Sequence, residues 1–425
     1  MANLIHKLKL IFGDQLLRKR ITFTLIILVL FRFLASIPIP GIDTLRLEQF
    51  ISGNDFLGLL NIFSGGGLSN LSIIMLGVSP YITASIIMQL LTVMFPKLKA
   101  MYQEEGDIGR RKFSQYSRLL TVPLAFVQGF AFITLLQNQG VLDRLELFPL
   151  LTNLVVITAG SLLLMWLGEL ISEFGIGNGV SLLIFAGIVA AIPGAAGQLF
   201  FQLQSDATML PTFIAFLAAA LLIVWGVVVV TEAERPIPIT YAKQVRGNKM
   251  YGGVSTYLPL RVNQAGVIPI IFALSILLFP QMIASFLANV GNAIVQTISS
   301  FFVTLLSNQI FYASMYFILV FLFTYFYTAI TFDPDSISKN LQRGGAFIPG
   351  VRPGVSTSSH IGKILFRLTL VGALFLGAIA VLPLIIQSLS GIGSIAIGGT
   401  GLLIVVSVVI DFVKKIDAQA SAHEY

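Results

Sequence analysis

The side chains that most often carry out chemistry are few in this sequence and widely separated. There is no cysteine, which excludes disulfides, thiol nucleophiles and cysteine–metal sites. The three histidines, His6, His360 and His423, lie in separate polar segments and lack the short spacing of metal ligands. No serine–histidine–acid set and no pair of carboxylates stands out. The residues therefore favour solvated loop histidines, and they predict neither a cofactor nor an enzymatic activity.

Two glycine-rich motifs resemble phosphate-binding loops only superficially. Ser64-Gly65-Gly66-Gly67 lacks the Gly-Lys-Ser/Thr that completes a phosphate loop. Gly175-Ile176-Gly177-Asn178-Gly179 follows no predicted strand, which a dinucleotide fingerprint requires. A turn between two membrane helices explains the second motif better.

The composition predicts an all-α polytopic membrane protein. Of 425 residues, 56% are hydrophobic and only 11% are charged, and the mean hydropathy is +0.91. Soluble domains carry about 25% charged residues. Apolar runs of about 20 residues argue against a barrel, whose segments are about ten residues long and alternate. The ten predicted spans are 21–37, 61–95, 119–137, 150–170, 180–201, 212–231, 265–286, 311–330, 364–387 and 395–412, with 294–306 as a short outer-face element.

One of these stretches, Asn61–Phe95, is interrupted twice, at Gly65-Gly66-Gly67 and at Ser79-Pro80. A bilayer core of about 30 Å needs roughly 20 apolar helical residues. Leu68–Val78 is too short for this, and Tyr81–Phe95 is marginal. Proline removes a backbone donor and disfavours helix at the preceding residue. A broken segment is typical of a protein-lined cavity or pathway, although a proline kink in an ordinary spanning helix fits the same residues.

The basic residues predict the orientation of the chain in the membrane. All 26 Lys and Arg residues except Arg32, Arg46 and Arg144 lie in the N-terminal arm, in loops 96–118, 232–264 and 331–367, or in the tail. An even number of spans puts these segments on one side, and the positive-inside rule makes that side cytoplasmic, both termini included. Residues 1–20 read as a cytoplasmic amphipathic segment. A cleaved signal peptide is the alternative, but Arg32 interrupts the apolar run and no clear cleavage site follows.

The organisation follows from these spans. We expect a first half, 21–203, a second half, 204–413, and a cytoplasmic tail, 414–425. Five spans per half would relate the halves as an inverted repeat. Loops 232–264 and 331–363 are long and rich in turn residues, which favours structured docking elements over simple connectors. Within the spans Arg32 is the only clear ionisable residue, which disfavours an ion-coupled carrier.

The chain resembles the SecY family, the channel subunits of bacterial protein translocases. The resemblance covers nearly the whole chain and rests on seven ordered blocks: FSGGGLSNLSIIMLGVSPYITASIIMQLL (63–91), EEGDIGRRKFSQYSR (104–118), GIGNGVSLLIFAGIVA (175–190), TEAERPIPITYAK (231–243), PLRVNQAGVIPIIFA (259–273), GGAFIPGVRPG (344–354) and GGTGLLIVVSVVIDF (398–412). It implies an hourglass channel that is hinged between its two halves. Such a channel conducts unfolded secretory polypeptides across the plasma membrane and releases hydrophobic segments sideways into lipid.

The resemblance also implies site residues. A plug on the outer side would span about 61–73 and include Asn61, Phe63, Ser64, Gly65, Gly66, Gly67, Leu68, Ser69 and Asn70. A half-helix would begin near Pro80. A pore ring of aliphatic side chains would comprise Val78, Ile82, Ile184, Ile188, Ile271 and Ile404. A lateral gate would place Thr83, Ile86, Ile87 and Gln89 against Ser275, Leu278 and Phe279, with polar contacts at the seam that are cheap to break.

Docking elements and partners follow from the same resemblance. The two long loops would receive the ribosome and the SecA motor ATPase through Lys243, Arg246, Lys249, Arg343 and Arg352. Asn248-Lys249 stands where relatives often carry paired arginines, so the resemblance does not define the ribosome contacts at this position. The family further implies small SecE-like and SecG-like membrane subunits, and it implies signal peptides, nascent chains and membrane lipid as ligands. A ten-span secondary transporter of a small solute is the alternative, and an intramembrane enzyme is a third class for which no buried nucleophile–base or metal arrangement is visible.

Overall fold

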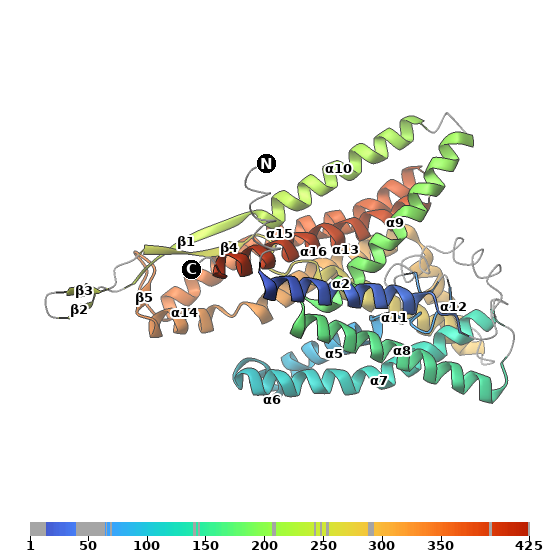
Figure 1. The fold of residues 1–425 in the computed structure, drawn as a ribbon, viewed down its shortest axis with the longest axis horizontal. Coiled ribbons are helices and arrows are strands. Elements are labelled where there is room, and N and C mark those ends of the chain that lie inside the picture. The colour runs from blue at the N-terminus through green and yellow to red at the C-terminus, as the bar shows by residue number, and fades with distance from the viewer. Residues whose placement is uncertain are drawn as a thin grey trace.

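The computed structural model describes residues 14–39, 64, 66–68, 70–138, 142, 145–205, 210–241, 244–246, 249–251, 255–287, 293–390 and 393–423. In this part of the chain most residues are helical, and the long helices lie side by side (Figure 1). The helices are α2 (Gln15–Ala35), α5 (Ser79–Met94), α6 (Pro96–Gln103), α7 (Gly106–Asn138), α8 (Leu147–Phe174), α9 (Gly179–Ser205), α10 (Leu210–Glu232), α11 (Ile268–Leu287), α12 (Ala293–Ser307), α13 (Gln309–Thr331), α14 (Pro334–Arg343), α15 (Val355–Ser390) and α16 (Gly393–His423). The strands are β1 (Glu234–Tyr241), β2 (Gln244–Arg246), β3 (Lys249–Tyr251), β4 (Ser255–Arg261) and β5 (Ala346–Phe347).

A helix lies at each of the ten predicted spans, and the short apolar run 294–306 forms α12. Four helical stretches of the described chain are long and apolar enough to cross a membrane: Gly106–Gln137, Leu147–Phe174, Gln309–Arg343 and Val355–Leu382. Helices α5 and α6 would form a fifth together, but they are bent by 116° at Phe95 and Pro96. The other helices have shorter apolar stretches. Their length and composition alone therefore do not establish ten spans.

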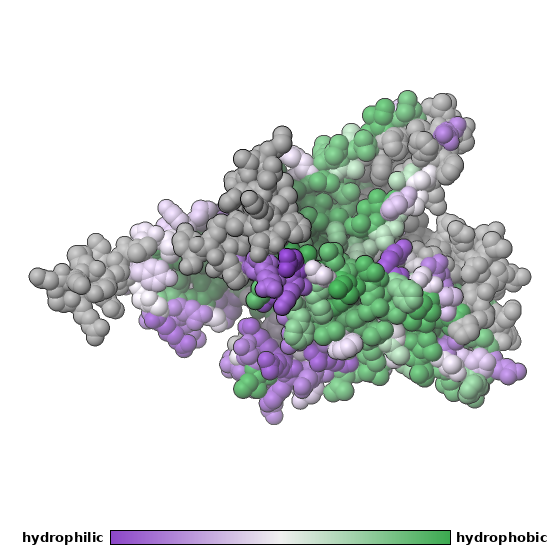
Figure 2. All heavy atoms as spheres, viewed as in Figure 1, coloured by the Kyte–Doolittle hydropathy of each residue, from purple (hydrophilic) through white to green (hydrophobic). Residues whose placement is uncertain are grey.

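The exterior of the helices is strongly apolar. Figure 2 shows hydrophobic residues over much of the helical surface and hydrophilic residues gathered near α6 and α14. Large side chains point outward from several helices, such as Val29 in α2, Trp166 in α8 and Trp225 in α10, with exposed fractions of 70%, 55% and 68%. Apolar surface of this extent is costly in water and favourable in lipid. The chain is a membrane protein.

The long helices pack in two sequential groups. Helices α2, α5, α7, α8 and α9 contact one another in the pairs α5–α7, α7–α8, α8–α9, α2–α8 and α2–α9. Helices α10, α11, α13, α15 and α16 do so in the pairs α11–α13, α13–α15, α15–α16 and α10–α16. Between the groups, α11 packs against α5 and α7 on one side, and α16 packs against α9 on the other. In the second group, α11 and α16 thus make the main contacts with the first group.

The two long loops meet in a single small sheet, at the end of the molecule that also carries α14 (Figure 1). Strands β1 and β4 pair antiparallel from Glu234↔Arg261 to Thr240↔Ser255, and β5 pairs with the end of β1. Strands β2 and β3, of three residues each, pair antiparallel as a hairpin at the tip of this end of the molecule (Figure 1). Ile237 and Leu260 from the first loop pack with Ile348 from the second and with α15. We call this end of the molecule the sheet end.

Candidate functional site

The segment before α5 is a chain of tight turns. The amides of Met75, Gly77 and Ser79 each donate to a carbonyl three residues earlier, at 2.9, 2.8 and 3.3 Å. Gly77 and Leu71 have positive φ angles of 59° and 39°, the latter unusual for a residue with a side chain. Regular helix begins only at Ser79, and Pro80 follows it. The missing N–H of proline costs nothing there, because the first N–H groups of a helix have no partner within the helix. The predicted first piece of the broken stretch is therefore not a helix, whereas the second piece is α5.

Protein surrounds this turn segment on both sides. Ile39 N–H donates to the Leu71 carbonyl at 2.9 Å, and Ile73 N–H donates to the Ile37 carbonyl at 3.1 Å. These bonds tie the segment to the end of α2. On the other side Leu68 and Leu71 are each 1% exposed and pack with residues of α7 and α8. Irregular backbone at membrane depth requires such shielding.

Some of the residues predicted to form a plug are described, and they lie within this shielded segment. Ser64 is fully buried and its hydroxyl accepts a hydrogen bond from Leu68 N–H at 3.0 Å. The Asn70 amide donates to the Ala35 carbonyl at 3.4 Å. Gly66 has a φ of 80°, which favours glycine. The predicted plug residues Asn61, Phe63, Gly65 and Ser69 lie outside the described residues.

The six residues predicted to form the pore ring all lie in the same buried region. Their exposed fractions run from 1% to 7%, and all six belong to one buried apolar cluster. Five of them lie in four helices: Ile82 in α5, Ile184 and Ile188 in α9, Ile271 in α11 and Ile404 in α16. The sixth, Val78, directly precedes α5. A Cβ added at Gly401 would lie 3.0 Å from Ile188 Cγ2, so α16 and α9 are close at this level. All six side chains are aliphatic, so this part of the cluster offers no hydrogen-bonding side chain.

The predicted gate residues lie where α5 packs against α11. Thr83 and Ser275 are each 8% exposed, and Ile86 is 2% exposed in the same apolar cluster as the ring. The sequence led us to expect polar contacts across the seam, but the hydroxyls of Thr83 and Ser275 do not donate across it. Thr83 donates to the Ser79 carbonyl at 3.0 Å and Ser275 donates to the Ile271 carbonyl at 2.9 Å, both within their own helices.

Gln89 adds a second feature to this seam. Its Oε1 atom is buried and has no hydrogen-bond partner among the described residues. Ile87 beside it is partly buried. The side chains of Leu278 and Phe279 lie outside the described part of the structure.

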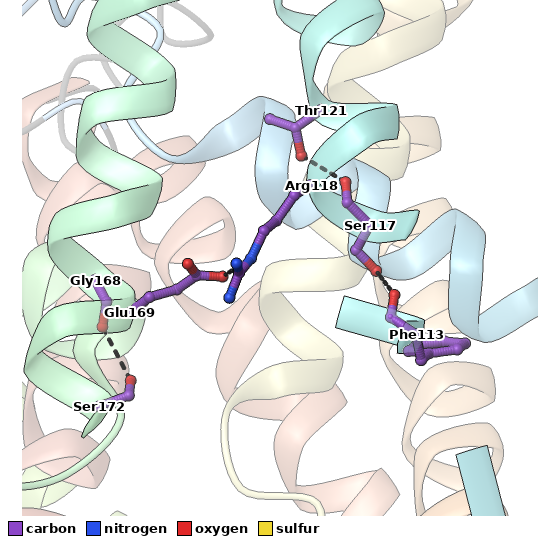
Figure 3. Close-up of polar contacts among 7 residues, drawn as sticks. All are labelled: Phe113, Ser117, Arg118, Thr121, Gly168, Glu169 and Ser172. Atoms are coloured by element: carbon purple, nitrogen blue, oxygen red, sulfur yellow. Dashed lines mark hydrogen bonds and ion pairs between the residues drawn. The ribbon is translucent and has the colours of Figure 1, made fainter. Parts of the chain in front are cut away.

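Each group of helices has an ion pair between two of its helices. Figure 3 shows Arg118 of α7 reaching Glu169 of α8, with Nε and Oε1 2.6 Å apart. Lys414 of α16 contacts Glu232 of α10, with Nζ and Oε1 2.8 Å apart. Both pairs are partly exposed, so each contributes little stability. Neither crosses the seam between α5 and α11.

The docking residues lie at the sheet end. Arg343 is exposed in the last turn of α14, and Arg352 is exposed in the turn that follows β5. Gly350 and Gly354 flank Arg352 with φ angles of 81° and 99°, and Ser338 Oγ donates to the Gly354 carbonyl at 2.7 Å. The Cα atoms of Arg246 and Lys249 face each other across the β2–β3 hairpin. The side chains of these two residues, and all of Lys243, are outside the described residues.

Sequence reasoning missed three parts of this arrangement. It expected structure in the two long loops but not the sheet that joins them, although 234–241 and 255–261 alternate in the manner of strands. It did not foresee the pairing of 37–39 with 71–73. It also missed a polar cavity near the ring, described below. Within the described residues, no group of three or more acidic or histidine side chains could hold a metal ion.

Fold and site together define a helical membrane protein with a large buried aliphatic cluster and a shielded turn segment before α5. A family model described as SecY matches residues 72–413. The protein translocase subunits SecY of Mycobacterium bovis and Thermus thermophilus are each 42% identical to this chain. The first alignment covers 96% of both chains, and the second covers 96% of this chain and 94% of the relative. The chain belongs to the SecY family.

Solved structures share the fold. A structure described as that of a protein conducting channel superposes with a TM-score of 0.65 at 22% identity, covering 95% of this chain and 92% of the other. A structure on the plug domain of the SecY protein gives 0.67 at 23% with the same coverage. Sec61 in a canine ribosome–channel complex gives 0.61 at 21%, covering 96% and 93%.

Proposed function

We propose that this chain is the channel subunit of a bacterial protein translocase. It passes unfolded secretory polypeptides across the plasma membrane and releases hydrophobic segments sideways into lipid. Membership of the SecY family supports this, as do relatives that are named protein translocase subunits. In this proposal all ten long helices cross the bilayer, with plug, ring and gate as the resemblance implies.

The buried aliphatic cluster is the observation that supports the proposal. All six predicted ring residues belong to it, and none of their side chains can replace the hydration shell of an ion. A constriction of this kind blocks ions by dewetting. It can still deform around an extended polypeptide, because the ring side chains make only van der Waals contacts with each other. A small-solute transporter would instead place polar binding groups at this level.

The plug and gate act on either side of this ring. The turn segment before α5 is the plug in this proposal, and two backbone hydrogen bonds to residues 37 and 39 hold it in place. Helices α5 and α11 form the lateral gate. Because Thr83 and Ser275 donate to carbonyls of their own helices, separation of α5 from α11 leaves both of these hydrogen bonds intact. Opening then costs mainly apolar contact, which a hydrophobic segment leaving through the gate replaces.

The sheet end is the cytoplasmic docking surface in this proposal. It receives the SecA motor ATPase and the ribosome, whose acidic or phosphate-rich faces attract exposed Arg343 and Arg352. One of the solved structures with this fold is described in a ribosome–channel complex. SecE-like and SecG-like subunits cover part of the exposed apolar surface. Both termini are cytoplasmic, and signal peptides open the gate.

Reconstitution tests this proposal against the solute-transporter alternative. The chain is placed in liposomes with its small membrane subunits, and a radiolabelled secretory precursor is added with the motor ATPase and ATP. We expect the precursor to become protected from external protease. Liposomes that lack only this chain are the matched control. Absence of protected precursor, together with uptake of a small solute, would favour the transporter.

A further inference from the structure

A cavity of about 290 Å³ opens next to the ring on the side of the sheet end. It is bounded by the starts of α9 and α11, the end of α13 and the middle of α16, and it lies about one helical turn from three of the predicted ring residues. Leu182, Ile268 and Val408 line it, and they stand two, three and four positions from Ile184, Ile271 and Ile404, respectively. In the proposed channel, a polypeptide moving from the sheet end to the ring passes through or beside this space.

Three polar side-chain atoms that line the cavity are buried and have no hydrogen-bond partner among the described residues. They are Asn263 Oδ1, Gln264 Nε2 and Ser407 Oγ. Asn263 is 5% exposed and Ser407 is 2% exposed. The Asn263 Nδ2 atom donates to the Gly266 carbonyl at 3.3 Å, which leaves Oδ1 as its unpaired end. Buried polar atoms are rarely unpaired in native proteins, so the partners of these three must come from what occupies the cavity.

Ser407 differs from most of the buried helical hydroxyls described, as Thr158 and Ser161 of α8 also do. In α7 the hydroxyl of Ser117 donates to the Phe113 carbonyl at 3.2 Å (Figure 3), and in α13 the hydroxyl of Thr324 donates to the Val320 carbonyl at 2.7 Å. This bond to the carbonyl four residues earlier is the usual way a helix satisfies a buried hydroxyl. Ser407 makes no such bond and remains available to the cavity.

The unpaired atoms match the polar groups of a peptide bond. Gln264 Nε2 can donate to a carbonyl, Asn263 Oδ1 can accept from an N–H, and the Ser407 hydroxyl can do either. The charged residues that line the same cavity, Arg261, Asp411 and Lys415, are of mixed sign and do not select one charge. We propose that Asn263, Gln264 and Ser407 form a binding site for the backbone of an extended polypeptide just before it enters the ring. This inference rests on the proposed function and names the part of the substrate that the channel recognises.

Backbone recognition suits a channel for many sequences. Every residue of an extended chain carries a carbonyl, and every residue except proline carries an N–H, whereas side chains vary. A volume of about 290 Å³ lies at the lower end of ligand pockets, so it admits a short extended stretch and not a folded domain. Because the hydrogen bonds to the site are few and weak, the translocating polypeptide can leave it and move on. The site would hold the polypeptide in line with the ring without stopping it.

The double variant Gln264→Leu/Ser407→Ala tests this site in the full complex in liposomes. We expect the rate of precursor translocation to fall roughly two- to tenfold, the effect of one or two net hydrogen bonds. The melting temperature of the empty complex should stay the same or rise, because the variant removes buried polar atoms that are unpaired without substrate. Ser117→Ala is the matched control, a buried helical serine whose hydroxyl is already paired. It should leave the rate unchanged.

A disulfide probe tests occupancy directly, since the chain has no cysteine of its own. Ser407→Cys should form a disulfide with a cysteine in a stalled precursor, and Ser117→Cys should not. An unchanged rate in the double variant with no disulfide at residue 407 would mean that the cavity holds only water. A slower rate with a lower melting temperature would assign these residues a structural role and overturn the inference. Failure of the wild-type complex to translocate would contradict the proposed function itself. A defect confined to the variants would concern only this site.

Discussion

Gly160 is where α8 comes closest to the turn segment, and Gly160→Ala tests whether that segment closes the channel. A Cβ added at Gly160 would lie 2.0 Å from the Ile73 carbonyl oxygen and 3.4 Å from the Ile74 Cα atom. Cβ atoms do not approach other heavy atoms to less than 3.0 Å, so the backbone at Ile73 must move by about 1 Å. The segment is held there by the hydrogen bond from Ile73 N–H to the Ile37 carbonyl.

The size of the effect follows from packing. Overfilling a close contact costs about 1–3 kcal/mol. The helix propensity that alanine gains over glycine does not offset this cost, because α8 is helical in both positions of the segment. The cost falls on the closed position alone, so it raises the ratio of displaced to closed segment about 5- to 160-fold.

Ion permeability of liposomes that contain the complex measures this ratio. We expect Gly160→Ala to leak more ions than wild type while it still translocates precursor. Gly194→Ala is the matched control, a glycine of α9 whose added Cβ would meet nothing within 4 Å. Equal leak in wild type and both variants would refute the assignment of residues 64–78 as the closing element.

Three further predictions concern the gate, the docking surface and an ion pair. A crosslink between Thr83→Cys and Phe279→Cys should stop translocation and reduction should restore it; unimpaired export by the crosslinked complex would argue against a gate at this seam. Arg352→Glu should weaken binding of the motor ATPase, with the loss smaller at high salt because exposed charges are screened, and an affinity that does not change with salt would contradict this. Glu169→Gln removes the partly exposed pair with Arg118 and should lower stability by less than about 1 kcal/mol, as measured by thermal unfolding, without slowing translocation. A large loss of either property would show that this pair holds α7 and α8 together.

The sequence predicted the positions of the long helices because apolar runs and prolines are local signals. The start of α5 at Ser79 is an example, since Pro80 permits a helix to begin but not to continue through it. Ile184 and Ile188 could likewise be placed on one face of a helix by their spacing. These two residues share one buried cluster with Ile271 and Ile404. That grouping depends on how distant helices pack, so only the family resemblance could suggest it.

Other features depend on contacts that no local pattern records. The pairing of 37–39 with 71–73 and the sheet shared by two loops each join residues far apart in the sequence. The expected polar contact across the gate was wrong for Thr83 and Ser275 for a local reason. A helical Ser or Thr hydroxyl reaches the carbonyl four residues earlier, so both are satisfied before another helix arrives.

Single cysteines in the ring test the central claim most directly. Ile82→Cys, Ile188→Cys and Ile404→Cys are each combined with a secretory precursor stalled halfway across reconstituted membranes. Leu217→Cys is the control, since Leu217 lies on the outer face of α10 with an exposed fraction of 53%. The account predicts strong crosslinks to the precursor at the three ring positions and none at residue 217. No ring crosslinks in membranes that demonstrably translocate the precursor would contradict a polypeptide path through this constriction.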